Sequence, residues 1–309
     1  MKLYRQLALG LTLWLFILAL TACDQISGPE ASDDYAEQKL MLDNGHYQVP
    51  GILVIPKQRL SNKLPAVVML HGTASQKNEV GGLYRRLAIA LANQGIASLR
   101  IDFAGTGDSP VDYRQYTLSS AQQDALTAIN YLTRQAAIDP QRIGVIGFSQ
   151  GGLIAQLVAV KDPRIKAMVT WSSVANNGIG PFQSMFDQYY AEAEQNGYAV
   201  VKFPWRARPL NFSLQWFNGI KTSNALDQMA NYNGRLLAIA GTGDHTVPYV
   251  SSIKLIDTVA SPMASLYLVK NANHMFNVLG DPNSNGLAVD QSKAEEVLAL
   301  TSNWFGRQL

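Results

Sequence analysis

Hydrophobic residues beyond about residue 60 gather in short, largely apolar runs, which are separated by longer stretches of mixed character. Runs of this length are typical of strands that are buried on both faces of a parallel sheet. The runs are Ala66–Leu70, Ala97–Ile101, Ile143–Ile146, Ala167–Trp171, Leu236–Ile239 and Ser265–Val269. Their alternation with helical stretches predicts an α/β fold with a doubly wound, mostly parallel sheet.

Three of the intervening stretches repeat apolar residues every three or four positions, which predicts amphipathic helices over about 83–91, 121–132 and 294–305. Ser120 and Gln123 have the spacing of a capping box at the start of the second helix. Open sheets of this kind place their sites at the carboxyl ends of the strands. Residues that directly follow the apolar runs are therefore the first candidates for chemistry.

Residues 39–56 precede the parallel strands and alternate loosely around Asn44 and Gly45, a dipeptide that favours a tight turn. This pattern predicts an antiparallel hairpin at an edge of the sheet. Together with the later runs, it predicts a single domain over residues 37–309.

The alternation stops between residues 173 and 232, where no further strand is apparent. Ten of the 28 aromatic residues lie between Phe182 and Phe217. Structureless loops of this length are uncommon in compact domains, so we expect a helical cap inserted over the sheet. The rings either face a substrate or pack the core of the cap, and we expect some of them, with Trp205 and Trp216 as candidates, to face a substrate.

The first 22 residues have the features of a lipoprotein signal peptide. Lys2 and Arg5 supply positive charge, and residues 7–20 form an apolar stretch shorter than the roughly 20 residues that a membrane-spanning helix needs. The following sequence LTAC, which ends at Cys23, resembles a bacterial lipobox, in which the cysteine is acylated and becomes the first residue after cleavage. A secretory signal with an incidental cysteine and an uncleaved anchor helix are the alternatives.

Residues 23–36 are polar, contain Gly, Pro and Ser, and lack periodicity, so we expect a flexible tether. Acylation at Cys23 would hold the protein at a membrane of the bacterial cell envelope, facing the periplasm, because two or more acyl chains anchor a protein stably. Asp24 is typical of lipoproteins that stay at the inner membrane, which slightly favours that location.

The charge balance gives no sign of nucleic acid as a partner, because such binding needs clustered Lys and Arg. The chain has 25 basic and 23 acidic residues, and loss of Lys2 and Arg5 with the signal peptide leaves 23 of each. The sequence also has no H-E-x-x-H motif, cysteine cluster or phosphate-binding loop, so no metal or cofactor is expected.

The strongest chemical signal is the sequence GFSQG at residues 147–151, which follows one apolar run and precedes an apolar helical stretch. A turn from strand to helix holds a serine nucleophile in a strained conformation, and its neighbours must be small. The start of a helix also favours negative charge that develops nearby. We therefore expect Ser149 to be a nucleophile.

A serine nucleophile needs a base, and the base needs a group that orients it. In the strand–turn–helix arrangement these residues follow in the order serine, acid, histidine, and of the four histidines only His274 has the last place. Asp244 follows a predicted strand and lies 95 residues after Ser149 and 30 before His274. Its neighbour His245 is interpreted as a turn residue, because adjacent side chains on a turn rarely converge on one serine.

Two N–H groups are expected to bind the oxyanion that forms when a serine attacks a carbonyl carbon. The first belongs to Gln150, the residue after Ser149. The second, by position, belongs to Thr73 in the loop after the first parallel strand, where Gly72 would allow a sharp turn and His71 is interpreted as structural.

Taken together, these residues resemble the α/β-hydrolase superfamily over about residues 39–309. The sequences DPQRIGVIGFSQGG at 139–152 and DFAGTGDS at 102–109 are similar to those of dienelactone-hydrolase-like and cinnamoyl-esterase-like branches. Ala104 stands where many relatives have Arg, so a stabilising contact of that Arg is not expected here.

The resemblance implies that Ser149, Asp244 and His274 form a catalytic triad and that Thr73 and Gln150 supply the oxyanion donors. We therefore expect a serine hydrolase that cleaves a carboxylic ester through an acyl-enzyme intermediate. A peptidase or amidase and an acyltransferase would use the same triad, although the chain leaves little room for the large accessory domain of oligopeptidases. An alternative of another class is a non-catalytic, lipid-anchored binding protein, against which the presence of all three triad residues argues.

Overall fold

The computed structural model describes residues 34–57, 63–281 and 286–309. The predicted signal peptide, Cys23, Asp24 and most of the predicted tether lie outside the described residues. Within the described ranges, no helix combines the length and the apolar character that crossing a membrane requires.

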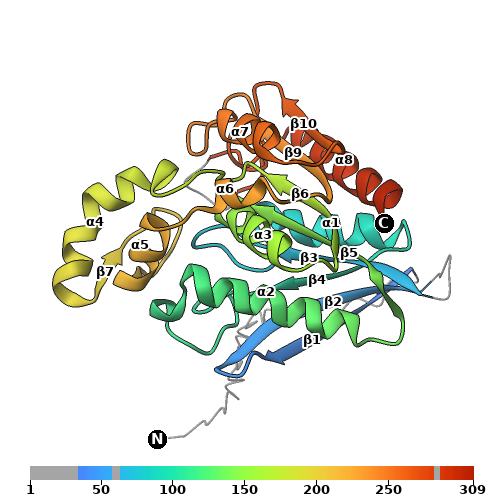
Figure 1. Cartoon of the computed structure of the whole chain (residues 1–309), viewed down its shortest axis with the longest axis horizontal. Helices are drawn as coiled ribbons and strands as arrows, with labels where there is room; N and C mark the ends of the chain where they lie inside the picture. Colours follow the sequence, from blue (N-terminus) through green and yellow to red (C-terminus); the bar gives the residue numbers. More distant parts are fainter. Residues whose placement is uncertain (1–33, 58–62, 282–285) are drawn as a thin grey trace, which may run out of the picture. The chain divides into compact units, whose positions relative to one another are not determined.

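The centre of the described unit is an eight-stranded sheet with the order β1-β2-β4-β3-β5-β6-β9-β10 (Figure 1). The six strands β4, β3, β5, β6, β9 and β10 are parallel to one another, and β2 is antiparallel to both of its neighbours, β1 and β4. All the predicted apolar runs lie in the parallel strands, so the predicted fold class is confirmed. The strands are β1 (Tyr35–Asp43), β2 (Gln48–Pro56), β3 (Leu64–Leu70), β4 (Ala97–Ile101), β5 (Ile138–Phe148), β6 (Ile165–Trp171), β9 (Arg235–Gly241) and β10 (Ala264–Val269).

Helices cover both faces of this sheet (Figure 1). Alternate residues of β3 separate the two layers: Val67 and Met69 belong to the hydrophobic cluster beneath α1 and α8, whereas Val68 and Leu70 belong to the cluster beneath α2 and α3. Successive side chains of a strand point to opposite faces of the sheet, so β3 is buried on both faces. These helices and the one after β9 are α1 (Leu83–Ala92), α2 (Leu118–Thr133), α3 (Gln150–Lys161), α7 (Val250–Thr258) and α8 (Ser292–Gln308).

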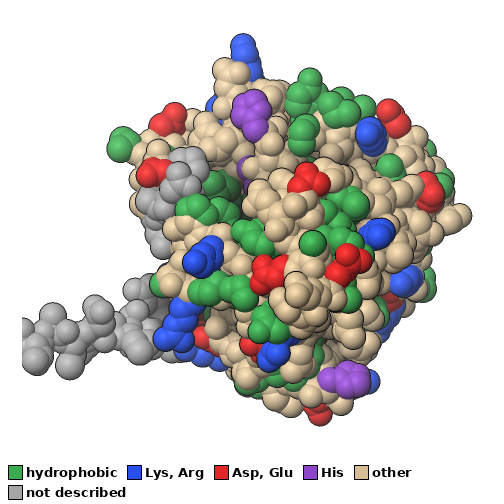
Figure 2. Space-filling view, turned by 90° about the vertical axis from the view of Figure 1, so that its left-hand side faces the viewer, with side chains coloured by type: hydrophobic (Ala, Val, Ile, Leu, Met, Phe, Trp, Pro, Cys, Tyr) green, Lys and Arg blue, Asp and Glu red, His purple; other side chains and the backbone are tan. Residues whose placement is uncertain are grey.

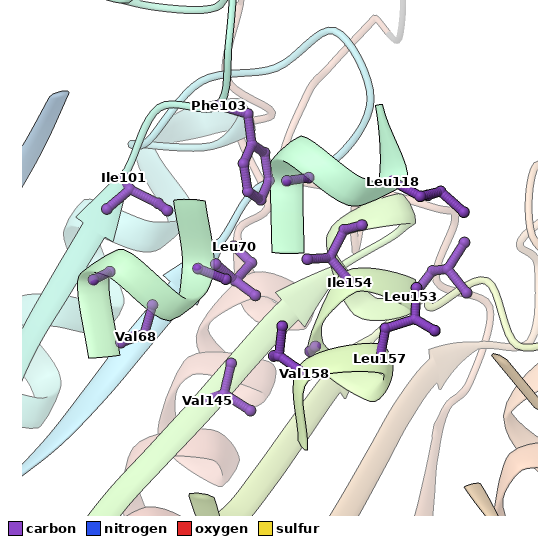
Figure 3. Close-up of a cluster of buried hydrophobic side chains, with 14 of the residues drawn as sticks. Val68, Leu70, Ile101, Phe103, Leu118, Val145, Leu153, Ile154, Leu157 and Val158 are labelled. Atoms are coloured by element: carbon purple, nitrogen blue, oxygen red, sulfur yellow. The ribbon is translucent and has the colours of Figure 1, made fainter. Parts of the chain in front are cut away.

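The larger cluster joins α3, the helix that follows Ser149, to the sheet. Figure 3 shows Val68 and Leu70 of β3 together with Val145 of β5 and Ile154 and Val158 of α3. None of these five side chains is accessible to solvent. The packing holds the N-terminus of α3 at the carboxyl ends of β3 and β5, where the sequence predicts the site.

The predicted hairpin is β1 and β2, which pair antiparallel from Tyr35–Pro56 to Asp43–Gln48. Gly45 takes the left-handed conformation (φ 88°) that a tight turn between strands needs. The strand begins four residues before the predicted start at residue 39, so the last two residues of the predicted tether belong to β1. Tyr35 explains the difference, because its ring is buried in the cluster beneath α1 and α8.

Asp124 of α2 ties this hairpin to the helical layer. Its Oδ1 accepts a hydrogen bond from Asn44 Nδ2 at 2.7 Å, and its Oδ2 accepts one from Tyr47 Oη at 3.0 Å. The side chain is fully buried. Desolvation by burial raises the pKa of Asp124 to about 7, although the hydrogen bonds from Asn44 and Tyr47 favour its charged form.

The raised pKa of Asp124 predicts a pH-dependent loss of stability. The folded chain keeps this proton at pH values at which an unfolded chain, with a pKa near 3.8, has lost it. The stabilising contribution is complete below about pH 4 and is lost as the pH rises toward 7, by up to about 1.4 kcal/mol per pH unit. In urea unfolding, Asp124→Asn should gain stability relative to wild type over this range and show a constant difference above it. Parallel stability curves for the two proteins would contradict the raised pKa.

The second predicted helix starts one turn earlier than expected, so its predicted capping box is wrong. The cap is Thr117, whose Oγ1 accepts from Ser120 N at 3.0 Å, while Ser120 Oγ accepts from Thr117 N at 2.8 Å. Ser120 is thus the third residue of the helix, and Gln123 takes no part in the cap. Leu118 is buried and extends the apolar face of the helix by that turn.

The insertion after β6 forms the predicted cap, and it contains two short strands that the sequence did not predict. β7 and β8 pair antiparallel as a separate two-stranded sheet. Gly197, with a φ of 80°, turns the chain from α4 into β7. The elements of the cap are the 3-10 turn η3 (Gly180–Phe182), α4 (Gln183–Asn196), β7 (Tyr198–Val201), β8 (Leu210–Ser213), α5 (Leu214–Lys221) and α6 (Ala225–Met229).

Most of the cap aromatics pack against one another. Trp216 is fully buried, and its ring lies 4.8 Å from Phe212 and 5.3 Å from Phe182, both edge to face. Phe186 and Phe217 complete the group, with ring centroids 5.2 Å apart. Trp216 is therefore a core residue of the cap, and the expectation that it faces a substrate is wrong.

Candidate active site

Ser149 lies at the turn between β5 and α3, with a φ of 54° that side-chain-bearing residues rarely adopt. Two backbone hydrogen bonds hold this conformation: Ser149 N donates to Trp171 O at 2.9 Å, and Val174 N donates to Ser149 O at 3.2 Å. Both partners lie at or just beyond the end of β6. The turn places the hydroxyl at the N-terminus of a helix of 12 residues, where the helix dipole favours negative charge.

The glycines of the GFSQG sequence are required by close backbone approach. A Cβ atom on Gly147 would lie 2.1 Å from Gly151 O, and one on Gly151 would lie 2.1 Å from Leu70 O. The first contact lies inside the turn, and the second lies between α3 and β3. Any larger residue would therefore push Ser149 away from β3 and from the loop that follows it, residues 71–79, which we call the oxyanion loop after the donor role expected for Thr73.

The structure brings Ser149, His274 and Asp244 together in one hydrogen-bonded line. Ser149 Oγ and His274 Nε2 are 3.1 Å apart, and His274 Nδ1 and Asp244 Oδ2 are 2.8 Å apart. With the proton on Nδ1, the ring donates to Asp244 and can accept the proton of Ser149. The side chain of Asp244 is fully buried, whereas His274 keeps a small exposed fraction of 16%.

Each member of this line is oriented by further contacts. Asp244 Oδ1 accepts hydrogen bonds from Thr246 N at 2.8 Å and Val247 N at 2.9 Å, which leaves Oδ2 for the histidine. The ring of Phe148 lies 4.9 Å from that of His274. The loops after β9 and β10 therefore hold the carboxylate and the imidazole in fixed positions relative to Ser149.

The other two candidate histidines have the positions expected of them. His245 is exposed on the turn after β9. His71 is buried, its Nδ1 lies 2.8 Å from Gly72 O, and its Nε2 accepts from Phe103 N at 3.1 Å. Burial lowers the pKa of His71 below its usual value of 6.5, so the ring stays neutral and joins two loops.

Thr73 and Gln150, the expected oxyanion donors, lie side by side. Thr73 Oγ1 donates to Gln150 Oε1 at 2.6 Å. Within the described ranges Thr73 N–H has no acceptor, and Gln150 N–H is the first of α3, where a helix offers no internal acceptor. Neither of the two amides is thus engaged by another described group.

The role expected for Gly72 differs from the one that the structure gives it. Its φ is not positive, whereas Ala74 in the same loop is left-handed, with a φ of 58°. A Cβ atom on Gly72 would lie 3.2 Å from the Cβ of Ser149 and 3.0 Å from the ring of Phe148. Gly72 therefore permits close approach of the loop to the nucleophile, and it does not make the turn.

Glu79 organises the oxyanion loop, and the sequence reasoning missed it. Its Oε1 accepts from Gly72 N at 2.5 Å, and its Oε2 accepts from Ser75 Oγ and Val80 N, both at 2.8 Å. The residue is buried and has a strained φ of 60°. Its only sequence signal is that it lies in the loop after β3, just before the 3-10 turn η1 (Val80–Gly82).

A buried ion pair joins the same loop to the DFAGTGDS sequence. Lys77 Nζ donates to Asp102 Oδ2 at 2.6 Å and to Asp108 Oδ2 at 2.7 Å. Asp102 Oδ1 also accepts from Lys77 N at 2.7 Å. Ala104 is fully buried, and the cation that meets Asp102 in this chain is Lys77.

Glu79→Ala should displace the loop that carries Thr73 and lower kcat by about 100-fold, the usual effect of losing one oxyanion donor, with a smaller change in KM. Glu79→Gln should retain more activity, because its oxygen can still accept from Gly72. Steady-state kinetics on one ester gives the comparison. Glu192→Ala is the control, since Glu192 also accepts a backbone N–H, that of Val200, but lies in the cap. An unchanged kcat in Glu79→Ala would contradict the positioning role.

The site lies at the end of the described unit that carries the cap. Figure 2 looks onto this end and shows hydrophobic side chains interspersed with polar ones around a hollow. Among the described residues, no group of three or more His, Cys, Asp or Glu side chains is arranged to hold a metal ion.

Comparison with known proteins gives a family match over residues 84–309, to the prolyl oligopeptidase family. An uncharacterized protein of Mycobacterium tuberculosis, Rv2307c, is 29% identical over 198 residues, which are 64% of this chain and 59% of that protein. The putative hydrolase YtaP of Bacillus subtilis is 30% identical over 171 residues, 48% of this chain and 57% of that protein. The chain thus covers less than two thirds of the length of these two relatives.

A human protein and two solved structures are also similar. The mitochondrial palmitoyl-protein thioesterase ABHD10 of Homo sapiens is 22% identical over 236 residues, which are 75% of this chain and 74% of that protein. Est1E of Butyrivibrio proteoclasticus, with ferulic acid bound, has a TM-score of 0.70 at 20% identity and covers 87% of this chain and 98% of its own. A dienelactone hydrolase of Anabaena variabilis has a TM-score of 0.60 at 18% identity and covers 89% of this chain and 99% of its own.

The solved structures share the fold of the described unit, a mostly parallel sheet with helices on both faces. The family match covers most of the chain, including the residues that form the hydrogen-bonded line at the turn after β5. This chain is therefore an α/β hydrolase that belongs to the prolyl oligopeptidase family.

Proposed function

We propose that this hydrolase cleaves carboxylic esters through an acyl-enzyme intermediate, with Ser149 as the nucleophile. The observation that carries the proposal is the hydrogen-bonded line from Asp244 through His274 to Ser149, located at a strained turn at a helix N-terminus. The names of similar proteins, a dienelactone hydrolase and a palmitoyl-protein thioesterase, support chemistry at an acyl carbon.

In the first half-reaction Ser149 Oγ attacks the ester carbonyl carbon while His274 Nε2 takes the hydroxyl proton. The carbonyl oxygen becomes an oxyanion, and the N–H groups of Thr73 and Gln150 are placed to bind it. The C–O bond to the alcohol then breaks. The alcohol leaves with the proton that His274 returns, and the acyl group stays on Ser149.

In the second half-reaction a water molecule takes the place of the alcohol. His274 removes a proton from the water, whose oxygen attacks the acyl carbon. Collapse of the second oxyanion breaks the bond to Ser149 Oγ, which recovers its proton from His274. Asp244 keeps the imidazole in the required tautomer and stabilises its charged form in both halves.

The family name makes peptide hydrolysis the second candidate function. The same steps cleave an amide, except that the departing amine depends more strongly on the proton from His274 than an alcohol does. An acyltransferase differs only in the second half-reaction, in which another alcohol or amine attacks in place of water. All three candidates need the same Ser149 and His274.

A fluorophosphonate probe tests the nucleophile, because it forms a covalent bond with an activated serine. The wild type should be labelled, and Ser149→Ala should not be labelled. Labelling that persists in Ser149→Ala would refute the assignment of the nucleophile.

Two substrate panels separate the candidate reactions: p-nitrophenyl esters of graded acyl length, and aminoacyl p-nitroanilides. The proposal expects turnover of the esters well above that of the anilides. Preferential cleavage of the anilides would identify a peptidase. Faster release of p-nitrophenol on addition of an alcohol, with formation of a new ester, would identify an acyltransferase.

We also propose that Cys23 carries the acyl chains of a lipoprotein and holds the enzyme at the cell envelope, facing the periplasm. The proposal rests on the apolar stretch and the LTAC sequence that precede the tether. Growth with an alkyne analogue of palmitate should label the wild type and leave Cys23→Ser unlabelled. A wild type that is unlabelled and fractionates without membranes would refute the proposal.

A further inference from the structure

The loop between β7 and β8, residues 202–209, has a composition unlike the rest of the chain; we call it the cap loop. It reads KFPWRARP and contains three cationic residues. Residues 195–226 around it contain four cationic residues in all and no Asp or Glu. The whole chain, in contrast, has nearly equal numbers of acidic and basic residues. This stretch of the cap therefore has a local excess of positive charge, whereas Asp187, Glu192, Glu194 and Asp227 balance the charge of the cap as a whole.

The cap loop presents a large aromatic ring to solvent. Trp205 is 45% exposed, whereas the other described tryptophans, Trp171, Trp216 and Trp304, are buried. Phe203 supports the indole from below, with ring centroids 5.0 Å apart, and in turn contacts Phe212 of the cap core. The ring is thus held outward by packing.

The three cationic side chains of the cap loop differ in their exposure to solvent. Lys202 and Arg208 are exposed on either side of Trp205. Arg206 is half-buried and donates from Nη1 to Ala74 O at 2.8 Å. Ala74 directly follows Thr73, so Arg206 joins the cap loop to the oxyanion loop and places the exposed residues at the edge of the site.

We propose that the cap loop docks on an anionic lipid surface. An exposed tryptophan beside lysine and arginine suits the boundary of a membrane, where the indole enters the headgroup region and the cations meet anionic lipids. Hydrophobic and cationic side chains lie next to each other on this face of the unit, with acidic side chains among them (Figure 2). Docking by this loop would turn the edge of the site toward the lipid, whichever bond the enzyme cleaves.

The test follows the fluorescence of Trp205 in the full-length protein, transferred from detergent into vesicles with brominated acyl chains. A Trp14→Phe background removes the tryptophan of the N-terminal apolar stretch. In vesicles that contain phosphatidylglycerol, bromine should quench a component of the emission that is absent in Trp205→Phe. In the double variant Lys202→Ala/Arg208→Ala, the ratio of protein with a docked cap loop to protein with an undocked one should fall by about fivefold for each cation removed.

Arg134→Ala/Lys161→Ala is the matched control. It also removes two exposed cations, but Lys161 ends the helix that Ser149 begins, and Arg134 follows the end of α2. The control pair should leave the quenching of Trp205 unchanged. The proposal fails if bromine does not quench Trp205, if neutral phosphatidylcholine vesicles give the same quenching as anionic ones, or if the control pair has the same effect. None of these readouts depends on catalysis, so they stand apart from the test of the proposed function.

Discussion

Replacing His274 with alanine is expected to lower kcat for ester hydrolysis by about 10⁴-fold or more, the usual effect of losing a triad base. The ring lies 3.1 Å from Ser149 Oγ and 2.8 Å from Asp244 Oδ2. Removing it leaves the serine proton without an acceptor and Asp244 Oδ2 without its donor. Ester hydrolysis measured at saturating substrate reports the loss directly.

His245→Ala provides the control for this substitution. His245 is next to Asp244 in the sequence, but it is exposed on the turn after β9. Its removal should leave kcat within about twofold of wild type, because surface substitutions away from such contacts rarely disturb a fold. A large loss in His245→Ala together with a small one in His274→Ala would reverse the assignment of the base.

The sheet could be predicted because its strands are buried on both faces. β4 and β6 each have at most one residue that is not fully enclosed, so most of their residues are apolar, although β4 also buries Ser98 and Arg100. The start of β1 could not be predicted in this way. Its burial pattern is irregular, and Tyr35 is held by packing against residues distant in the sequence.

The structure inside the cap was harder to predict from the sequence. β7 and β8 have four residues each, too few for a period of two to differ from chance. Likewise, an aromatic residue at a given position suits a substrate pocket or a hydrophobic core equally well. Only the three-dimensional arrangement shows that Trp216 is enclosed while Trp205 is exposed.

For the candidate site, the sequence indicated those residues whose positions follow from strand ends. Ser149, Asp244 and His274 come after β5, β9 and β10, and the structure places them within hydrogen-bonding distance of one another. Glu79 and Lys77 were not predicted, because they act on backbone amides and carboxylates that the folded loop brings to them. Contacts of this kind leave no fixed spacing between residues in the sequence.

Gly151→Ala is expected to damage both the fold and the activity. The added Cβ would lie 2.1 Å from Leu70 O and 2.5 Å from His71 O, so α3 and β3 must separate. Overpacking of this kind costs about 3 kcal/mol or more when backbone atoms must move. The same movement shifts Ser149 relative to the oxyanion loop, and a displacement of about 1 Å lowers kcat by about 100-fold.

Gly219→Ala separates this effect from a general intolerance of alanine. Gly219 lies inside α5, and a Cβ atom there would have ordinary contacts with Leu118 at 3.7 Å. Alanine is favoured over glycine within a helix by about 0.5–1 kcal/mol, so this variant should be slightly more stable than wild type and fully active. Urea unfolding should therefore show a loss of stability in Gly151→Ala and a small gain in Gly219→Ala, and the rate of ester hydrolysis should fall only in Gly151→Ala. A Gly151→Ala protein with wild-type stability and kcat would show that α3 tolerates a shift away from β3, and the glycine would then not be required at the turn that holds Ser149.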